Sequence, residues 1–275
     1  MRAGESMAGF DTHVHSVASD GALAPADVVA LAKERGLLGM ALTDHDTVDG
    51  LAEALAAGKE LDITVLPGIE LSAEYKDHDV HVLGYWIDPE RMRATGRLQE
   101  LSQARTRRVY EMARRLDILG MPVDADAILA AAGTSPGRPH VAAAMIDAGY
   151  VANLREAFAK WLGRGCPAYV PRPKLSPFEA VELIIRCGGA AALAHPGCGV
   201  PDRLIKPLIR AGIGGVEVYH PDHDRVAEKK YAAIALHNGL AALGGSDFHS
   251  PGQRELGCRV TTVGQLGKLA ACRRD

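Results

Sequence analysis

The 275-residue chain is poor in aromatic side chains and has no excess of either charge. Aromatic residues make up 5% of the sequence, and the formal net charge is −3. A continuous base-stacking platform for single-stranded nucleic acid is therefore not expected. No broad basic face is expected to attract a polyanion either. Any attraction for a phosphorylated ligand must then be local.

Disulfides, export and membrane insertion have little support in the sequence. The five cysteines are odd in number and include no CxxC pair, which favours reduced thiols in the cytoplasm. No run approaches the ~20 apolar residues of a membrane-spanning helix, and the polar segment before Met7 lacks the apolar stretch of a signal peptide. We expect a cytoplasmic protein with no membrane contact and no obligate protein partner.

Strand and helix patterns alternate on both sides of an all-helical stretch. They alternate over residues 8–90 and 167–270, with a last short strand at 258–263. Alternation of this kind predicts a parallel sheet, closed into a barrel if functional residues follow the strands. Residues 91–166 carry helical patterns without a strand signal. A stretch of this length is more than a loop, so we predict an α/β barrel with an inserted all-helical subdomain.

Potential metal ligands stand where the apolar runs end. Because the carboxyl ends of barrel strands meet at one mouth, these side chains are expected to converge there. An HxH pair alone is weak evidence, and an Asp-rich strand end such as TDHD can simply start a helix. A carboxylate directly after an apolar strand, however, needs a partner or a cation. The nine candidates are His13, His15, Asp20, His45, Glu70, His81, His195, Asp247 and His249.

The remaining polar residues near these motifs receive other roles. Asp11 shares the alternation of the HxH pair and is expected to orient one imidazole. Three histidines are excluded from the site: His78 lies in a charged run, His223 in a polar loop and His237 within a helical pattern. The combined pattern predicts metal-assisted hydrolysis, foremost of a phosphate ester.

Six ordered motifs resemble those of the PHP (polymerase and histidinol phosphatase) superfamily: DTHVHSVASDG, TDHDT, PGIELS, HVLGY, AHP and GSDFH. The resemblance covers about residues 8–90 and 167–255 and implies a distorted (β/α)7 barrel with three divalent cations. It implies a first ion held by His13, His15, Glu70 and Asp247. It implies a second held by Glu70, His81 and His195, and a third held by Asp20, His45 and His249. Manganese is favoured by the resemblance, while iron or zinc suits the same nitrogen and oxygen ligands.

The same resemblance implies a mechanism in which divalent cations bridge and activate the attacking hydroxide and hold the phosphate oxygens. The leaving oxygen then needs a proton. His220, in VEVYHP beside Glu217, is one candidate donor, although it is also read as a loop histidine without a role. Asp44, acting on the attacking water, is the alternative.

The predicted insert carries basic residues that suggest a second phosphate site. A guanidinium beside free helix-terminal amides can bind phosphate, although a solvated face with a helix cap is the simpler interpretation. The candidates are Ser135, Arg138, His140, Arg164 and Tyr169. A basic stretch containing Arg107, Arg108, Arg114 and Arg115 could guide a longer RNA.

Within the superfamily, the chain resembles 3′,5′-nucleotide bisphosphate phosphatases and 5′-3′ exoribonucleases. The resemblance implies that the metals bind the 5′-phosphate of a phosphorylated nucleotide or short RNA, while the insert holds the 3′-phosphate. Alternatives are a histidinol-phosphate-type phosphatase, a polymerase-associated module, and a metal-binding regulatory domain without catalysis. Metal-dependent amide hydrolysis is a further possibility, but no lysine stands among the motifs.

Overall fold

The computed structural model describes residues 9–132, 136–171 and 175–273. Contacts divide the chain into two compact units. The first consists of Met1–Gly96 with Lys174–Asp275, and the second of Arg97–Pro173. The second unit begins and ends a few residues later than the 91–166 insert expected from the sequence.

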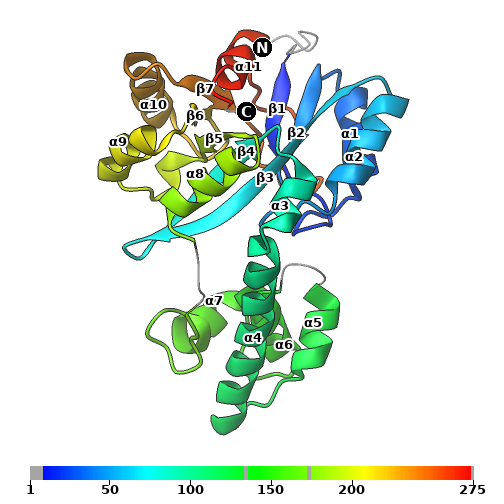
Figure 1. Ribbon diagram of the computed structural model, residues 1–275. Helices are drawn as coiled ribbons and strands as arrows, with labels where there is room; N and C mark the ends of the chain where they lie inside the picture. The colour runs from blue at the N-terminus through cyan, green and yellow to red at the C-terminus, as the bar shows by residue number, and fades with distance from the viewer. Residues whose placement is uncertain (1–8, 133–135, 172–174, 274–275) are drawn as a thin grey trace. The chain divides into compact units, whose positions relative to one another are not determined.

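The first unit is built on a seven-stranded sheet whose strands lie in chain order. They are β1 (Phe10–Val14), β2 (Gly39–Leu42), β3 (Thr64–Tyr75), β4 (His78–Tyr85), β5 (Ala190–Leu193), β6 (Gly215–Tyr219) and β7 (Ala241–Gly244). The segment after β7 returns to β1, where the His15 N–H donates to the Phe248 carbonyl at 2.9 Å. The sheet is therefore a nearly closed barrel, and the predicted distorted (β/α)7 fold class is confirmed (Figure 1).

The parallel pattern expected from the sequence is interrupted at β4. This strand runs antiparallel to both β3 and β5, while the other neighbouring pairs are parallel. Only Lys76 and Asp77 separate β3 from β4, and both have positive φ, 45° and 71°. Positive φ at both central residues is the geometry of a tight hairpin turn. A connection this short cannot carry the crossover that a parallel neighbour requires.

The short strand predicted at 258–263 is also wrong. Only Thr261 in this segment pairs with the sheet, as an isolated antiparallel bridge to Phe10. The Thr261 hydroxyl instead contacts the Thr12 hydroxyl at 3.0 Å, and the Gly244 N–H donates to it at 2.7 Å. The segment therefore ties the ends of β1 and β7 together without adding an eighth strand.

Helices surround the sheet and position its strands. They are α1 (Pro25–Glu34), α2 (Leu51–Glu60), α3 (Pro89–Ala94), α8 (Pro177–Arg186), α9 (Asp202–Ala211), α10 (Arg225–His237) and α11 (Val263–Ala270). α8 begins with a capping box: the Ser176 hydroxyl accepts the Glu179 N–H, and the Glu179 carboxylate accepts the Ser176 N–H. No helix in the described part of the chain combines the length and apolarity needed to cross a bilayer.

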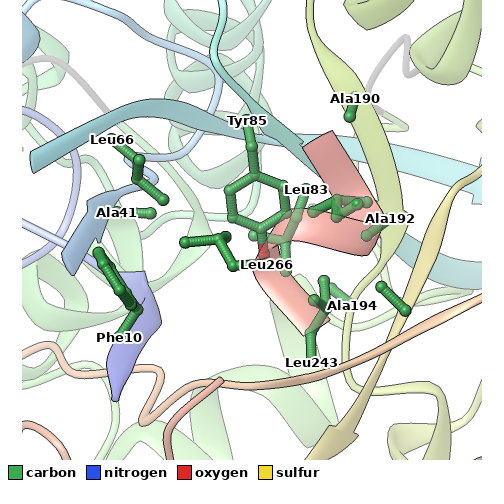
Figure 2. Close-up of a cluster of buried hydrophobic side chains, with 12 residues drawn as sticks. Phe10, Ala41, Leu66, Leu83, Tyr85, Ala190, Ala192, Ala194, Leu243 and Leu266 are labelled. Atoms are coloured by element: carbon green, nitrogen blue, oxygen red, sulfur yellow. The ribbon is translucent and has the colours of Figure 1, made fainter. Parts of the chain in front are cut away.

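An apolar cluster fills the barrel (Figure 2). Small alanines from β2, β5 and β7 leave room for Tyr85 of β4 and for Leu266 and Leu269 of α11. The Tyr85 hydroxyl is not left unpaired, because it donates to the Thr12 carbonyl at 3.1 Å. Burial of these apolar side chains is worth roughly 25 cal/mol per Å² and fixes the strand ends in place.

The second unit is all helical in its described residues. It contains α4 (Arg97–Ile118), α5 (Ala125–Ala132), α6 (Arg138–Asp147), α7 (Leu154–Ala157) and a π-helical turn, η1 (Phe158–Leu162). These elements pack around their own buried apolar cluster, which includes Val109, Met112, Leu116, Val141 and Met145. The unit therefore has a core separate from that of the barrel.

Candidate metal centre

All nine ligands predicted from the sequence lie within the strands of the barrel or in the segments that follow them. His13, His81 and Glu70 stand within β1, β4 and β3, and the other six stand in the segments that follow β1, β2, β5 and β7. Two of these six have positive φ, His195 at 20° and Asp247 at 50°. Such backbone conformations are costly for residues other than glycine and cluster at functional sites.

Glu70 is the centre of this group. Its carboxylate is fully buried, and the ring nitrogens of five histidines lie within 3.3 Å of its oxygens. The distances are 3.1 Å for His13 Nε2, 3.3 Å for His15 Nε2, 3.2 Å for His45 Nδ1, 2.8 Å for His81 Nδ1 and 3.2 Å for His195 Nε2. Oε1 faces His81 and His195, whereas Oε2 faces the other three.

Two further carboxylates complete the group. Asp247 Oδ1 lies 3.3 Å from His13 Nε2 and 3.2 Å from His15 Nε2. Asp20 Oδ1 lies 3.4 Å from His249 Nε2, and its Oδ2 lies 3.8 Å from His45 Nε2. Each carboxylate is therefore within reach of at least three imidazoles, as expected of groups arranged around shared cations.

Several imidazole nitrogens in the group are buried without a hydrogen bond. Both ring nitrogens of His15, Nδ1 of His45 and Nδ1 of His81 have no hydrogen-bond partner within the described residues. Buried polar atoms are almost always satisfied, and these stand close to carboxylate oxygens without the alignment of a hydrogen bond. Nitrogen lone pairs and carboxylates that converge in this way suit divalent cations.

The ligand atoms form compact sets that match the expected ions closely. His13, His15, Glu70 and Asp247 form one set, and His15, Asp20, His45 and His249 form another. A third set joins Glu70 and His81 to His45. The resemblance had placed His195 there instead of His45. The donors are imidazole nitrogens and carboxylate oxygens, which fit manganese, iron or zinc.

A pocket of about 190 Å³ opens onto this group. Its lining comprises His45, Glu70, His81, His195, Cys198, His220, Asp222, Asp247 and His249. Two of these residues, Cys198 and Asp222, were not predicted from the sequence. The volume suits a phosphate group with part of its ester.

Glu217 of β6 is a buried carboxylate that the sequence had placed only beside His220. Its Oε1 lies 3.1 Å from His13 Nδ1, and its Oε2 accepts the His195 N–H at 2.8 Å. Burial alone would raise the pKa of Glu217, but the His13 imidazole outweighs it and holds the pKa below its usual value. A charged residue between Val216 and Val218 on a buried strand is a signal that could have identified it.

The expected role of Asp11 is wrong. Its carboxylate accepts backbone N–H groups from His13 at 3.2 Å, Ser246 at 2.9 Å and Gly257 at 2.7 Å. The imidazole of His13 is instead held by Glu217. Asp11 therefore ties β1 to the loop that carries Asp247.

His223, which we had excluded as part of a polar loop, is buried beside the site. Its Nδ1 donates to the Val218 carbonyl at 2.9 Å, and its Nε2 accepts the Gly197 N–H at 3.0 Å. Gly197 belongs to a single 3-10 turn, η2 (Pro196–Cys198), directly after His195. His223 thus holds the turn that carries a candidate ligand, a role that its polar sequence neighbours conceal.

His220 lies at the pocket with one ring nitrogen already committed. Its Nδ1 accepts the Asp222 N–H at 3.1 Å, so Nε2 carries the hydrogen. Nε2 lies 3.4 Å from Asp247 Oδ2. Although Cys198, His220 and Asp222 also cluster, an imidazole with this hydrogen-bonding pattern donates from Nε2 and does not ligate a cation there.

Asp44, the alternative catalytic candidate, uses both carboxylate oxygens in hydrogen bonds with serines of the loop after β1. Its Oδ1 accepts from the Ser16 N–H at 2.8 Å and the Ser19 hydroxyl at 2.6 Å, and its Oδ2 accepts from the Ser16 hydroxyl at 2.8 Å. It does not line the pocket. The structure places it as a brace for the loop after β1.

The residues expected to bind substrate in the second unit are partly brought together. The Arg138 guanidinium lies over the rings of Phe158, at 5.4 Å, and Tyr169, at 5.9 Å. His140 Nδ1 accepts the Gly137 N–H at 3.2 Å. Arg164 is exposed, and Ser135 lies outside the described residues.

Three arginines in the basic stretch of α4 make local contacts within the second unit. Arg114 and Arg115 both bind the Glu111 carboxylate, at 2.8 Å and 2.9 Å. Arg108 donates to the Val170 carbonyl at 2.7 Å. These contacts support the solvated-face interpretation over a track for RNA.

Metal affinity is expected to rise with pH. Burial alone would lower the pKa values of His15 and His195. The nearby Asp247 and Glu70 carboxylates raise the pKa of His15 to about 9, and Cys198 and Glu70 raise that of His195 to about 10. Protons on these rings compete with cations, so manganese binding should release protons at pH 7.5 and tighten towards pH 8.5. Calorimetry in buffers of different ionisation enthalpy measures this release, and binding without proton exchange would contradict it.

Comparisons with known proteins agree with this geometry. A family model described as the PHP domain matches residues 11–154. A 3′,5′-nucleoside bisphosphate phosphatase from Chromobacterium violaceum is 37% identical, over 90% of this chain and 89% of its own. A 5′-3′ exoribonuclease from Haemophilus influenzae is 33% identical, over 92% of this chain and 95% of its own.

A solved structure supports the same assignment. The crystal structure of a protein described as a metal-dependent phosphoesterase, from Bifidobacterium adolescentis, superposes with a TM-score of 0.85 at 31% identity. It covers 98% of both chains. The chain therefore belongs to the PHP family and is a metal-dependent phosphoesterase.

Proposed function

We propose that this enzyme removes the 5′-phosphate from 3′,5′-nucleoside bisphosphates. The observation that carries the hydrolytic part is the set of buried imidazole nitrogens without hydrogen bonds around Glu70 and Asp247. The substrate is supported by similarity to the Chromobacterium violaceum phosphatase, which extends over 90% of this chain and so includes most of the second unit. Three divalent cations, manganese foremost, are proposed to be held by the nine ligands named above.

The bound cations would supply Lewis-acid activation of water and charge for the phosphate oxygens. Among the chain's own residues, His220 is proposed to contact the leaving oxygen. Because its Nδ1 accepts the Asp222 N–H, its Nε2–H is a fixed hydrogen-bond donor at the pocket. It would stabilise negative charge on that oxygen, and solvent would supply the proton. We assign Asp44 no contact with substrate.

Arg138 is proposed to bind the 3′-phosphate. Its guanidinium stands at the start of α6 and is oriented by the rings of Phe158 and Tyr169. A planar guanidinium held in this way can donate two parallel hydrogen bonds to a phosphate. Tyr169 would act by orienting Arg138. Binding of substrate by His140, Arg164 and Ser135 remains a proposal.

The test compares substrates with and without the 3′-phosphate. Arg138→Ala should lower kcat/KM for 3′-phosphoadenosine 5′-phosphate about 10–100-fold, the value of a hydrogen bond to a charged group, and leave adenosine 5′-monophosphate unaffected. Arg155→Ala, an exposed arginine on α7, is the matched control. Equal losses on both nucleotides would contradict the assignment.

Trimming of RNA from its 5′ end is the second candidate, favoured by the similarity to the Haemophilus influenzae exoribonuclease. A 5′-phosphorylated RNA oligomer and histidinol phosphate belong in the same assay. Preference for the oligomer over the bisphosphate would favour this second function. If the enzyme hydrolysed only histidinol phosphate, the metal-dependent reaction would stand, and the proposed binding of a 3′-phosphate by Arg138 would be wrong.

A further inference from the structure

We propose that Glu217 is a positioning residue that prearranges ligands of two different metal ions at once. The inference rests on the metal centre described under the proposed function. Glu217 is not one of the proposed ligands. One of its carboxylate oxygens binds the ring of His13, and the other binds the backbone N–H of His195.

The first contact sets the tautomer of His13. A carboxylate accepts hydrogen bonds and cannot donate them, so His13 Nδ1, 3.1 Å from Glu217 Oε1, must carry the hydrogen. The other ring nitrogen, Nε2, lies 3.1 Å from Glu70 Oε2 and 3.3 Å from Asp247 Oδ1, so the hydrogen on Nε2 is the one that a bound cation would displace. Carboxylates behind ligating histidines orient the ring and strengthen its basicity.

The second contact holds the backbone of His195. This residue has φ 20° and ψ 59°, a conformation that few non-glycine residues adopt. Glu217 Oε2 accepts its N–H at 2.8 Å and thereby aims the imidazole, with Nε2 3.2 Å from Glu70 Oε1. His13 faces Glu70 Oε2 and His195 faces Glu70 Oε1, so the two rings stand at different oxygens of the shared carboxylate and one buried Glu217 supports both.

The packing around Glu217 leaves little freedom for another arrangement. The residue is 1% exposed, and a Cβ on Gly245 would lie 3.0 Å from its Oε1 and overlap the Cβ of His13. Glycine at position 245 therefore permits the close approach of the segment directly after β7 to this pair. The side chain is confined to the position that reaches both ligands.

Glu217→Gln tests the proposal with almost no change of shape. The amide has one oxygen for two donors. If that oxygen stays on the His195 N–H, the amide NH₂ faces His13 Nδ1 and drives the ring hydrogen to Nε2. If the amide turns over, the His195 N–H loses its acceptor. Either way we expect manganese to bind about 10–100-fold more weakly at one site, the usual cost of losing such a contact.

Manganese content per chain after gel filtration, and the manganese dependence of the unfolding temperature, measure this loss without reference to activity. Glu228→Gln on α10, whose carboxylate is 3.6 Å from Arg259 Nη2, is the matched control. Excess manganese should restore kcat in Glu217→Gln, because a positioning residue acts through occupancy. Wild-type manganese affinity in Glu217→Gln would overturn the proposal.

A second measurement needs no variant at this position. In zinc-loaded wild-type protein labelled with ¹⁵N-histidine, His13 should show a protected hydrogen on Nδ1 and a metal-bound Nε2, with His13→Asn used to assign its signals. A His13 bound through Nδ1 would overturn the role of Glu217 alone. A wild-type protein that retains no ion would overturn both this role and the metal centre.

Discussion

Glu70→Gln is expected to lower phosphate release by at least about 10³-fold, equivalent to about 4 kcal/mol of transition-state stabilisation. Each oxygen of the Glu70 carboxylate faces a different set of imidazoles. A glutamine keeps the volume but presents NH₂ hydrogens to one of the two sets. The substitution also removes a buried negative charge. Burial opposes this charge, but His45 and His13 stabilise it and hold the pKa of Glu70 well below its usual value.

Release of inorganic phosphate at saturating manganese measures the effect. Glu74→Gln, four residues along the same strand β3, is the control and should retain wild-type turnover. Activity in Glu70→Gln within tenfold of the wild type would show that the shared carboxylate is dispensable, and the proposed cation arrangement would fail.

Removal of divalent cations should abolish hydrolysis and lower the unfolding temperature together. The imidazoles and carboxylates are buried at the strand ends, so bound cations stabilise the folded state over the unfolded one. A single ion at 100 times its dissociation constant contributes about 2.7 kcal/mol, or roughly 5–10 °C for a domain of this size. Treatment with a chelator followed by thermal unfolding and phosphate assays, before and after manganese is restored, measures both effects.

The control for this experiment is Glu70→Gln, whose unfolding temperature should respond much less to manganese. Iron and zinc, added in place of manganese, rank the ions by the turnover that each restores. Full turnover in the presence of excess chelator would contradict the metal-dependent reaction.

The candidate ligands could be predicted because their positions follow from chain order. HxH, TDHD and GSDFH lie at or just after the ends of apolar strands, PGIE lies within β3, and the sheet keeps these strands in sequence order. Residues at successive strand ends must then meet, whatever the details of packing. The antiparallel course of β4 escaped the same reasoning, because the two residues between β3 and β4 carry no strong turn sequence.

The residues behind the ligands depend on tertiary packing. Asp11 and Glu217 are both buried acids near His13, and alternation along β1 favoured Asp11 as its partner. In the structure, the strand pairing shifts register between Asp11 and Val14. Asp11 binds backbone amides, and Glu217 binds the imidazole of His13. His223 lies in a polar sequence, yet the fold buries it under η2.

The sequence by itself determined the barrel class, the family and the set of nine candidate ligands. The hydrophobic periodicity, the order of the motifs along the chain and the residue types can all be read without atomic positions. Only the tertiary structure decided which carboxylate supports which imidazole, which nitrogen of His220 carries the hydrogen, and that Asp44 braces a loop. The pairing of His13 with Glu217 joins strands about 200 residues apart along the chain, and Asp44 binds serines in the loop after another strand. Local sequence pattern does not specify side-chain partners over such separations, because hydrogen bonds and packing select among several chemically equivalent candidates.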